Sequence, residues 1–401
     1  MKKNNLCKNM LKLKSLAELD VRGKRVLLRC DFNIPLDAGG NIQDDFRINQ
    51  TLPTIEYLIK HQAKVVLMSH LGDPEGKRVE SLSLVPVQKK LSEYLGLQIK
   101  KTEDCIGREA EKEVAKLQDG GILLLENLRF HKEEEANDPE FVRELAKLGD
   151  VYVNDAFGVC HRKHASIFGL AQALPAAAGL LLEKEVKVLS RVLEDPWRPL
   201  CAVIGGAKIS TKIKVIKQFL EKADNVLIGG KIAEPILIVK KICIGRSWPE
   251  EEVAREIEKL DLTSTRLHLP IDAAISPDPS GNLYIRQAAP GKTRKDELLL
   301  DIGDETISFF SQIIKDAKMI IWAGPMGYFE NPAFEKGTKE IAEAIARNIN
   351  AYKIVGGGDT LFAVSKFGLI DKFDHVSTGG GAMLVFLGGE ALPGLQVLEK
   401  K

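Results

Sequence analysis

Two lysines close to a glycine turn offer cationic chemistry near the middle of the chain. In the stretch IGGAKISTKIKVI, an apolar run that ends at Ile204 meets two glycines, and Lys208 and Lys212 follow. Residues four apart lie on one face of a helix, so we expect both ammonium groups on the same face near a helix start. The N-terminus of a helix already carries partial positive charge. Two further cations at that end are typical of a site that binds an anion.

Glycine clusters end the strand-like runs in the second half of the chain. In an open parallel sheet, ligands bind beyond the carboxyl ends of the strands. Glycine at these ends lets backbone N–H groups approach phosphate oxygens, and the following helix presents its positive end. Strand-to-helix turns also need glycine for steric reasons, but five clusters at corresponding strand ends favour a phosphate site. The clusters are Gly205-Gly206, Gly229-Gly230, Gly324, Gly356-Gly357-Gly358 and Gly379-Gly380-Gly381.

A carboxylate, Asp359, directly follows the three glycines in VGGGDT. Its negative charge would repel phosphate, but a carboxylate suits Mg²⁺ that bridges to phosphate oxygens, directly or through water. The alternative is that Asp359 caps the helix that follows. The two roles are compatible, and we favour the metal role.

The common nucleotide-binding motifs are missing from the sequence. GxxxxGK[ST] does not occur: PGKT, which begins at Pro290, ends like this motif, but Arg286 takes the place of its first glycine. We therefore expect Lys292 to be an ordinary loop lysine. No GxGxxG opens the first strand, which disfavours a nicotinamide-dependent dehydrogenase.

Arginine and histidine take the place of glycine at the strand ends of the first half. The planar fork of arginine suits bidentate contact with phosphate or carboxylate. A single such residue is more often part of a surface ion pair, and this interpretation is kept for His131 and His164. Several at one sheet edge, in a chain of net charge +1, predict a pocket for a small polyanion. The residues of this group are Arg29, Asp31, Asn33, Arg47, His70, Arg129, His161 and Arg162.

Apolar runs that alternate with helical patterns must position these residues. The runs are nearly continuous in apolar residues, as is typical of parallel strands buried on both faces. They are RVLLRCDF, AKVVLMSHL, GGILLLENL and VYVNDAF in the first half, and CAVIGG, NVLIGG, MIIWAGP, KIVGGG and VSTGGG in the second. The helical patterns include PVQKKLSEYLG, EEVAREIEKL and GTKEIAEAIARN. We predict an α/β fold with two doubly wound parallel sheets.

Length and composition limit the class of protein. A chain of 401 residues is too long for one ordinary core, so two domains are expected. Their join is predicted in EKEVKVLSRVLEDPWRP, a helical pattern stopped by Pro196 and Pro199, although an ordinary surface helix is the alternative. With 28% charged residues and a net charge of +1, the chain does not fit a surface for nucleic acid or anionic membrane.

The N-terminal segment and the cysteines bear on the compartment. MKKNNLCKNMLKLKSL is basic but lacks the apolar core and cleavage site of an export signal, and no apolar run is long enough to span a membrane. We therefore expect a cytoplasmic protein. The cysteines form no CxxC pair, which predicts reduced and mostly buried thiols. They are Cys7, Cys30, Cys105, Cys160, Cys201 and Cys243.

Nine segments occur in an order that closely resembles the phosphoglycerate kinase family. They are RCDFNIP, DDFRI, SHLG, LLENLRFHKEEE, VNDAFGVCHR, IGGAKISTK, GPMGYFE, VGGGDT and STGGGA, and they cover the chain from about Leu13 to its end. The resemblance implies two Rossmann-like lobes joined by a helical hinge. It places the 3-phosphoglycerate lobe at residues 1–185, the hinge at 186–200 and the nucleotide lobe at 201–388, with the tail 389–401 packed on the first lobe.

The resemblance also implies an activity. The family's reaction is reversible phosphoryl transfer between 1,3-bisphosphoglycerate and ADP, which gives 3-phosphoglycerate and ATP with Mg²⁺ in glycolysis and gluconeogenesis. The expected partners are these small molecules, without nucleic acid or membrane, and the expected state is a monomer. A non-catalytic nucleotide-binding relative is the alternative.

Two sets of site residues follow from the resemblance. The 3-phosphoglycerate site is expected to comprise Arg29, Asp31, Phe32, Asn33, Arg47, His70, Asp73, Arg129, His161 and Arg162. The nucleotide site is expected to comprise Lys208, Lys212, Gly229, Gly230, Gly327, Glu330, Gly356, Gly357, Gly358, Asp359 and Thr360. Within this set, Asp359 is the metal ligand, Glu330 accepts from the ribose hydroxyl and Lys212 holds nucleotide phosphate.

The resemblance assigns the catalytic step to positive groups from both lobes. Arg47 and Lys208 are expected to reach the phosphoryl group in transfer, and the amides of Gly379, Gly380 and Gly381 to cap it. Negative charge spreads over the equatorial oxygens of the transition state, so fixed positive groups that face those oxygens accelerate the reaction.

One departure from the family's pattern lies in the first half. SHLGDP has Asp73 where an arginine is usual. We expect Asp73 to pair with Lys77 or Arg78 and to leave the phosphate site weaker than in the family.

Three further departures lie near the expected adenine pocket. Ala323 stands where asparagine is usual, GGKIA carries Lys231, and LLLDIG has Leu299 where glycine is common. The choice between ATP and GTP therefore stays open at the level of sequence.

Overall fold

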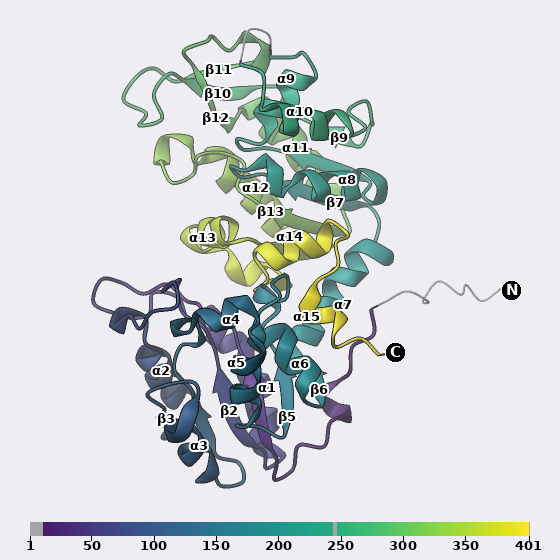
Figure 1. Cartoon of the computed structure of the whole chain (residues 1–401). Coiled ribbons are helices and arrows are strands. Elements are labelled where there is room, and N and C mark those ends of the chain that lie inside the picture. The colour runs from purple at the N-terminus through teal and green to yellow at the C-terminus, as the bar shows by residue number, and fades with distance from the viewer. Residues whose placement is uncertain (1–10, 244–246, 401) are drawn as a thin grey trace, which may run out of the picture. The chain divides into compact units, whose positions relative to one another are not determined.

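Two compact units make up the chain, and each has its own parallel sheet (Figure 1). The computed structural model describes residues 11–243 and 247–400, so Cys7 lies outside the described residues. Unit 1 consists of Met1–Lys187 and Ala391–Lys401, and unit 2 of Val188–Glu390. The two sheets with helices around them confirm the predicted α/β fold class.

Unit 1 is built on a six-stranded sheet of order β3-β4-β2-β1-β5-β6 in which all neighbouring strands are parallel. The strands are β1 (Arg25–Arg29), β2 (Lys64–Met68), β3 (Lys100–Lys101), β4 (Ile122–Leu124), β5 (Val151–Asn154) and β6 (Ala176–Ala178). The α-helices are α1 (Phe46–Lys60), α2 (Val85–Leu95), α3 (Gly107–Ala115), α4 (Lys132–Ala136), α5 (Pro139–Ala146), α6 (Leu170–Ala173) and α15 (Pro393–Gln396). Helix α7 (Leu180–Glu194) begins in unit 1 and ends in unit 2. Short turns are η1 (Leu16–Glu18), η2 (Glu80–Leu82), η3 (Leu128–Phe130), η4 (Phe157–Val159) and the π-helical η5 (Ala165–Gly169).

Local sequence accounts for where several of these helices begin and end. Asp138 caps α5, since its carboxylate accepts hydrogen bonds from the backbone N–H groups of Glu140 and Phe141, and Pro139 provides the first helical residue. Gly96 ends α2 in the left-handed conformation at φ 62°, which costs glycine little. The predicted pattern PVQKKLSEYLG thus forms a helix at the expected place.

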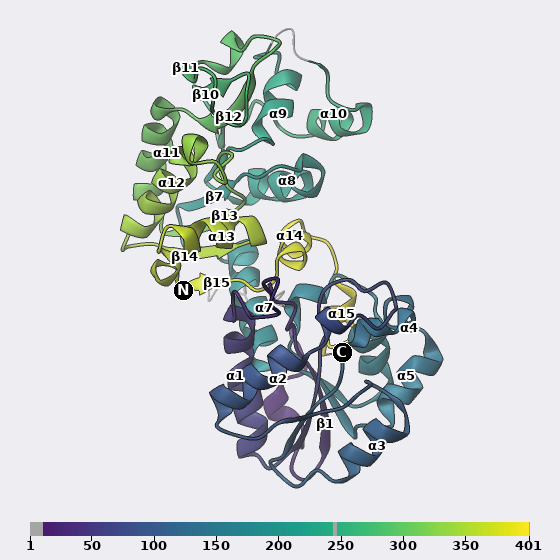
Figure 2. The same cartoon turned by 90° about the vertical axis from the view of Figure 1, so that its left-hand side faces the viewer.

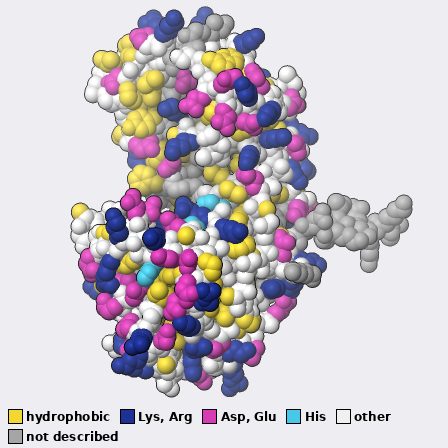
Figure 3. Space-filling view, viewed as in Figure 1, with side chains coloured by type: hydrophobic (Ala, Val, Ile, Leu, Met, Phe, Trp, Pro, Cys, Tyr) yellow, Lys and Arg dark blue, Asp and Glu magenta, His cyan; other side chains and the backbone are white. Residues whose placement is uncertain are grey.

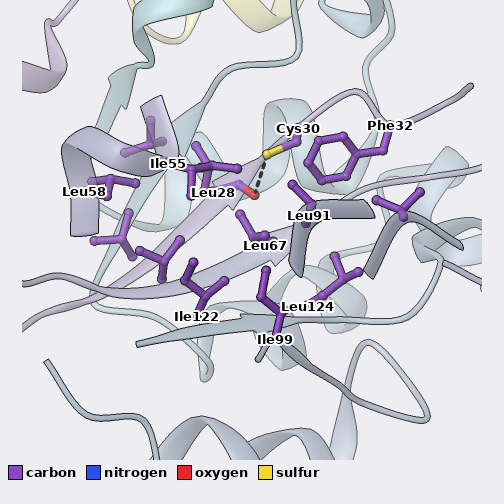
Figure 4. Close-up of a cluster of buried hydrophobic side chains, with 14 of the residues drawn as sticks. Leu28, Cys30, Phe32, Ile55, Leu58, Leu67, Leu91, Ile99, Ile122 and Leu124 are labelled. Carbon is purple, nitrogen blue, oxygen red and sulfur yellow. Dashed lines mark hydrogen bonds between the residues drawn. The ribbon is translucent and has the colours of Figure 1, made fainter. Parts of the chain in front are cut away.

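The core of unit 1 lies between this sheet and its covering helices (Figure 4). Leu28 of β1, Leu67 of β2 and Leu124 of β4 are fully buried, as are Ile55 and Leu58 of α1. Continuous burial along the strands is the reason that the sequence reads as unbroken apolar runs. The thiol of Cys30 lies within this cluster, and all five described cysteines are free and buried, as predicted.

Unit 2 contains a second six-stranded parallel sheet, of order β15-β14-β13-β7-β8-β9. Its strands are β7 (Leu200–Ile204), β8 (Asn225–Ile228), β9 (Leu267–His268), β13 (Met319–Ala323), β14 (Tyr352–Gly356) and β15 (His375–Val376). The helices are α8 (Ile213–Lys222), α9 (Ala233–Val239), α10 (Glu251–Glu258), α11 (Asp304–Asp316), α12 (Lys336–Arg347), α13 (Gly358–Lys366) and α14 (Gly381–Leu387). Short turns are η6 (Ile209–Thr211), η7 (Pro290–Lys292), η8 (Pro332–Phe334) and η9 (Ile370–Lys372).

A small antiparallel sheet in unit 2 was not expected from the sequence. It has the order β11-β10-β12, formed by β10 (Ala273–Ser276), β11 (Arg286–Ala288) and β12 (Leu298–Ile302). These strands are short, and β11 is only partly buried. They therefore lack the continuous apolar runs that marked the parallel strands.

The C-terminal segment returns to unit 1 (Figure 2). Leu13 pairs with Glu399 in an antiparallel bridge, and the backbone N–H of Lys14 donates to the carbonyl of Leu398 at 2.9 Å. The N–H of Gly394, in α15, donates to the carbonyl of Cys160 at 2.9 Å. The two ends of the described chain thus pack side by side. Among the described residues, no helix combines the length and apolar character needed to cross a membrane.

Candidate active site

The anion-binding residues predicted in the first half lie at the carboxyl ends of the strands of unit 1. Arg29 is the last residue of β1, and its register partners are Met68 of β2 and Asn154 of β5. His70 follows β2, and Arg129 lies in η3, just after β4. Because these neighbouring strands are parallel, their ends meet at one edge of the sheet and bring distant segments together.

Arg47, near the start of α1, is tied to the loop that follows β1. Its Nη1 donates to Oδ2 of Asp31 at 2.8 Å and to the carbonyl oxygen of Asn33 at 3.2 Å. The amide oxygen of Asn33 in turn accepts a hydrogen bond from the N–H of Gly72 at 2.8 Å. The Arg47 side chain remains 31% exposed, so its guanidinium is oriented by the protein and still accessible to a ligand.

Arg129 and Arg162 share one carboxylate, that of Glu135 in α4. Its Oε1 lies 3.2 Å from Nε of Arg129 and 3.8 Å from Nη1 of Arg162. Nη1 of Arg129 also donates to the carbonyl of Gly72 at 2.8 Å. Glu135 was not predicted as a site residue. It lies in the acidic run HKEEE, which is typical of a solvated helix face.

His70 is a buried ring next to the arginines of unit 1. Its ring is buried, and burial together with the charges of Arg29, Arg129 and Arg47 holds its pKa well below the ordinary value. Nδ1 of His70 lies 3.2 Å from Nη2 of Arg29. The imidazole therefore stays neutral at physiological pH and adds no charge to that of the arginines around it.

His161 and His164 lie in the loop that carries Arg162. Nδ1 of His161 is buried and has no hydrogen-bond partner among the described residues. Burial lowers its pKa, and Arg162 acts in the same direction. His164 is buried, and burial with the charge of Arg129 lowers its pKa to about 3. The expected surface ion pair at His164 is therefore wrong, because the ring is inside the protein.

Two residues of the predicted substrate site have side chains that solvent does not reach. The ring of Phe32 is fully buried in the core of Figure 4, and Arg29 is 1% exposed. Nε of Arg29 donates to the hydroxyl of Ser166 at 2.8 Å, and this hydroxyl donates to Glu134 at 2.5 Å. Neither side chain is exposed to solvent in this structure, because both are enclosed by the fold. Phe32 anchors the loop, and Arg29 supports His70.

The expected partner of Asp73 was wrong. Arg78 pairs with Glu103, at 3.2 Å, and lies 3.8 Å from Glu80, and no ion pair of Asp73 with Lys77 or Arg78 forms within the described residues. Asp73 is exposed, and its charge raises the pKa of Arg129 against the larger lowering by burial. Asp73 thus places negative charge next to the basic group itself.

Charge on the rest of the surface is mixed. Figure 3 shows acidic and basic side chains interspersed over the visible face, in keeping with a net charge of +1. The basic group in unit 1 is therefore a local feature that the topology concentrates at one sheet edge.

Lys208 and Lys212 do not share a helix face, so that prediction was wrong. Lys208 has an extended backbone and precedes η6, while Lys212 lies between η6 and α8. The turn of η6 separates the two residues, so the helical periodicity does not apply to them. Lys208 is exposed, whereas Lys212 is 7% exposed.

The side chain of Lys212 contacts the end of one strand in unit 2. Its Nζ donates to the carbonyl of Ala323, the last residue of β13, at 3.0 Å. Burial lowers the pKa of Lys212 to about 8, and the nearby carboxylate of Asp359 acts in the opposite direction. A buried ammonium with so little compensation is poised to be stabilised by an arriving anion.

Asp359 fits a magnesium ligand better than a helix cap. It lies inside the first turn of α13, whose N-cap is Gly357. Its carboxylate is exposed, and none of its oxygens takes part in a hydrogen bond or ion pair with another described residue. Mg²⁺ in phosphate sites is held by one or two carboxylates together with phosphate and water. An uncommitted carboxylate at the end of β14 meets that requirement.

Several glycines of unit 2 are required because the strand ends pack tightly against each other. A Cβ on Gly205 would lie 2.1 Å from the carbonyl oxygen of Pro325, and one on Gly324 would lie 2.1 Å from that of Gly205. A Cβ on Gly230 would lie 2.7 Å from the backbone nitrogen of Gly206. Gly229, Gly327 and Gly356 are crowded by the side chains of Met326, Asp301 and Met383.

Other glycines face open space. A Cβ on Gly358 or Gly380 would meet nothing within 4 Å. Gly357 and Gly380 adopt positive φ, at 97° and 48°, and each provides the N-cap of a helix, α13 and α14. The N–H of Gly379 donates to the hydroxyl of Ser377, and Gly381 is the first residue of α14. These positions allow close approach of a ligand to the backbone, which the packed glycines do not.

The remaining predicted nucleotide residues divide in the same way. Glu330 is exposed, and no other described residue pairs with its carboxylate. Thr360 is buried, and its hydroxyl accepts a hydrogen bond from the N–H of Gly324 at 2.7 Å. Thr360 therefore holds a neighbouring turn. Thr338 was not predicted as a site residue. Its hydroxyl accepts a hydrogen bond from the N–H of Met326 at 3.0 Å and so holds the turn at Met326.

The departures near the expected adenine pocket occupy different environments. Leu299, in β12, lines a narrow hollow together with Gly230 and Met326. Lys231 is exposed, whereas Ala323 is buried and offers its carbonyl to Lys212. Lys292 ends the short turn η7 and is exposed, so PGKT forms no phosphate-binding loop.

Comparisons with known proteins show which family the chain resembles. A family model described as Phosphoglycerate kinase matches residues 16–390. A protein of Dictyoglomus turgidum named Phosphoglycerate kinase is 50% identical over 396 residues, which cover 96% of this chain and 98% of that protein. One of Moorella thermoacetica with the same name is 48% identical and covers 96% and 99% of the two chains. The solved structure of phosphoglycerate kinase from Coxiella burnetii aligns with a TM-score of 0.84 at 38% identity, over 96% of this chain and 99% of that chain.

Proposed function

The chain belongs to the phosphoglycerate kinase family, and we propose that the two sites described above serve the reaction of that family. The chain is a phosphotransferase with a carboxyl group as acceptor. The reaction is reversible phosphoryl transfer between 1,3-bisphosphoglycerate with ADP and 3-phosphoglycerate with ATP, in glycolysis and gluconeogenesis.

The basic group of unit 1 is the proposed site for 3-phosphoglycerate. The observation that carries this assignment is that Arg47 and Arg129 are held at one sheet edge by linked hydrogen bonds: Arg47 donates to the carbonyl of Asn33, the amide oxygen of Asn33 accepts from Gly72, and the carbonyl of Gly72 accepts from Arg129. A small molecule with a carboxylate and a phosphate at its two ends matches several fixed guanidinium groups. Arg162 and the unpaired Nδ1 of His161 extend the same site.

The acceptor needs no general base. The carboxyl group of 3-phosphoglycerate is ionised above about pH 4, so it attacks as a carboxylate without loss of a proton. The protein's task is to place this carboxylate in line with the phosphoryl group and to neutralise the charge on the equatorial oxygens. Arg47 is suited to the second task, because Asp31 and Asn33 orient it while its side chain stays accessible.

The glycine-rich strand ends of unit 2 are the proposed nucleotide site. The N-terminus of α13 presents backbone amides at Gly357 and Gly358, where a phosphate can approach closely. Lys212 lies beneath this edge as a buried cation, and Lys208 is exposed and positioned to follow the phosphoryl group. Glu330 is the proposed acceptor of a ribose hydroxyl.

Asp359 is the proposed magnesium ligand. A bound Mg²⁺ supplies charge neutralisation to the nucleotide phosphates. The chain's own part is to keep the Asp359 carboxylate free of protein partners at the end of β14 and to hold Lys212 nearby. Gly380 and Gly381 would present amides at the start of α14, whereas the N–H of Gly379 is bonded to the hydroxyl of Ser377.

The proposed domain roles follow from the positions of the two sites. Residues 1–185 with the tail 389–401 would form the 3-phosphoglycerate lobe and 201–388 the nucleotide lobe, with a hinge at 186–200. Arg47 and Lys208 belong to different units, so transfer requires a state in which both reach the same phosphoryl group. We propose that the protein works as a cytoplasmic monomer on small molecules.

A coupled assay tests the proposal. With 3-phosphoglycerate and Mg-ATP, turnover is expected to require both substrates and to cease when Mg²⁺ is chelated. Nucleotide binding without turnover would support the non-catalytic alternative instead. The same assay with GTP shows whether Lys231, Leu299 and Ala323 relax the choice of base.

A further inference from the structure

Three side chains of unit 1, outside both sites, form a group with the chemistry of a transition-metal site. They are Asp104, Cys105 and His131, and one ligand atom of each lies within 4.8 Å of the others. Thiolate, imidazole and carboxylate are the three ligand types that zinc takes from proteins. The resemblance to the kinase family assigns no role to any of these residues.

The fold holds these residues from two segments. Asp104 and Cys105 lie between β3 and α3, and the hydroxyl of Thr102 donates to the carbonyl of Asp104 at 2.6 Å. His131 separates η3 from α4, and its ring packs at 5.3 Å from that of Phe141. The two segments are therefore fixed independently of any cation, so the ligands are largely preorganised.

Burial of the group is graded. Cys105 is fully buried, the side chain of His131 is 25% exposed and that of Asp104 is 50% exposed. The thiol thus forms the floor of the site, and the other two groups form its mouth toward solvent. The sulfur itself is not exposed, so a cation reaches it only when the side chains of Asp104 and His131 shift.

We propose that Asp104, Cys105 and His131 bind one divalent cation of the zinc class, with the fourth position open to water. Zinc bonds of about 2.0–2.3 Å place the ligand atoms of a tetrahedral site about 3.3–3.8 Å apart. The most distant atoms of the group must therefore approach by up to about 1 Å, while the hydrogen-bonded atoms of Asp104 and His131 must separate. Coordination replaces the hydrogen bond of 2.6 Å between Asp104 Oδ1 and His131 Nε2. The thiol gives its proton to solvent as the sulfur becomes a ligand.

Glu134 is a neighbouring carboxylate that we do not count as a ligand. Its charge acts on the thiol of Cys105, but its two oxygens accept hydrogen bonds from the N–H and hydroxyl of Ser166. Breaking that arrangement would disturb Arg29, which bonds the same hydroxyl. We therefore assign three protein ligands and leave Glu134 bonded to Ser166. Three protein ligands with one position open to water are typical of catalytic zinc sites, whereas structural zinc sites have four protein ligands.

The competing explanation is an ordinary ion pair between Asp104 and His131 that lies by chance above a buried thiol. The two explanations differ in what Cys105 does. A cation bound by the group takes sulfur as a ligand, whereas an ion pair does not involve the sulfur at all.

Titration with Co²⁺ distinguishes them, because its visible spectrum reports tetrahedral geometry and its near-ultraviolet charge-transfer band reports a thiolate ligand. The full chain carries Cys7→Ser, so that the thiol outside the described residues does not contribute, and is first freed of metal with a chelator. We expect one Co²⁺ per chain with both spectral features, and displacement by an equimolar amount of Zn²⁺. Absence of the charge-transfer band would overturn the proposal.

Single variants in the same background identify the ligands. Cys105→Ser is expected to abolish the charge-transfer band. Asp104→Asn and His131→Gln are expected to weaken Co²⁺ binding by more than about tenfold, since even the outer partners of metal ligands cost about 10- to 100-fold in affinity. Both residues are partly exposed, so the variants should fold, and circular dichroism checks this. Cys201→Ala, which removes a buried thiol of β7, is the control and should bind as the parent does.

Each contrary result is decisive. If Asp104→Asn and His131→Gln both keep the parental affinity for Co²⁺, Cys105 is the only ligand of the three, and the three-ligand assignment is refuted. Loss of the band in Cys201→Ala would place the cation elsewhere and refute it as well.

Discussion

The two candidate sites solve the problem of binding phosphate in opposite ways. In unit 1, arginines do the work, and each is held by protein groups: Arg47 by Asp31 and Asn33, and Arg129 by Glu135 and the carbonyl of Gly72. In unit 2, backbone turns do much of the work, and the charged groups are left without such partners. Lys208 and Asp359 form no ion pair with another described residue.

We infer that the site of unit 1 is preorganised before its ligand binds, whereas the charged groups of unit 2 gain their partners only when the ligand binds. A small rigid substrate is best met by guanidinium groups fixed in advance, because little entropy is then lost on binding. A nucleotide that arrives with Mg²⁺ brings both charges with it, so a free carboxylate and a lightly compensated lysine suffice. Substitutions in each unit test this contrast.

Removal of the cation that each site directs at the phosphoryl group should have the largest effect. Arg47→Ala and Lys208→Ala are each expected to lower kcat on the order of 10²–10³, because each removes a charge that stabilises the transition state. Arg47→Lys should recover little, since Nη1 alone makes both contacts, with Asp31 and Asn33, and a lysine has no second terminal nitrogen to offer the phosphoryl group. Steady-state kinetics in the coupled assay measure these effects.

Matched controls exist in both units. Arg78→Ala removes an exposed arginine that pairs with Glu103, and Lys217→Ala removes an exposed lysine of α8. Both should retain parental kcat. Intact turnover in the double variant Arg47→Ala/Lys208→Ala would refute the catalytic assignment of both residues.

Asp359 tests whether unit 2 depends on its metal as proposed. Asp359→Asn keeps the size of the side chain and removes its charge, so the Mg²⁺ concentration for half-maximal activity should rise by at least about tenfold. The KM for 3-phosphoglycerate should not change, because that site lies in unit 1. Activity measured against Mg²⁺ at saturating ATP provides the test, and an unchanged requirement would exclude Asp359 as a ligand.

A pH profile separates lysine from arginine. Burial lowers the pKa of Lys212 to about 8, so this residue loses its charge in the free protein as the pH rises through that value. Since the charged form binds phosphate, kcat/KM for ATP should fall above pH 8, by about tenfold at pH 9. The KM for 3-phosphoglycerate should stay flat over this range, because guanidinium groups remain charged.

Lys212→Arg sharpens this test. An arginine at position 212 stays protonated, so the decline of kcat/KM for ATP between pH 8 and pH 9 should disappear. If the parental decline persists in Lys212→Arg, another group is responsible for it.

Asp73 is expected to have the smallest effect. It is exposed and acts on Arg129 through its charge, so Asp73→Arg should lower the KM for 3-phosphoglycerate by no more than about fivefold, as is usual for exposed charges. Asp73→Asn should give a smaller change in the same direction. If both variants keep the KM of the parent protein for 3-phosphoglycerate, Asp73 does not influence substrate binding.

The fold was largely predictable because its signals are local. Parallel strands buried on both faces need unbroken apolar runs, and RVLLRCDF and MIIWAGP became β1 and β13 for that reason. The antiparallel sheet was missed, because β11 is three residues long and only partly buried, which leaves no pattern to detect.

The candidate site was predictable in kind but not in detail. Glycine and arginine at strand ends identified the two edges, and the motif order identified the family. The same residue types did not reveal that Phe32 and Arg29 are enclosed, or that Thr360 holds the turn at Gly324. Nor did they reveal that Glu135 joins Arg129 to Arg162.

The sequence by itself determined which segments become strands and helices, and therefore which residues stand at the carboxyl ends of the sheets. Only the tertiary structure decided which of those residues face solvent and which face each other. Lys208 and Lys212 show the reason: they share one short segment, yet one is exposed and the other lies beneath the carbonyl of Ala323, more than a hundred residues away. Burial and charge compensation depend on such distant contacts, and these two quantities set the chemistry of a side chain.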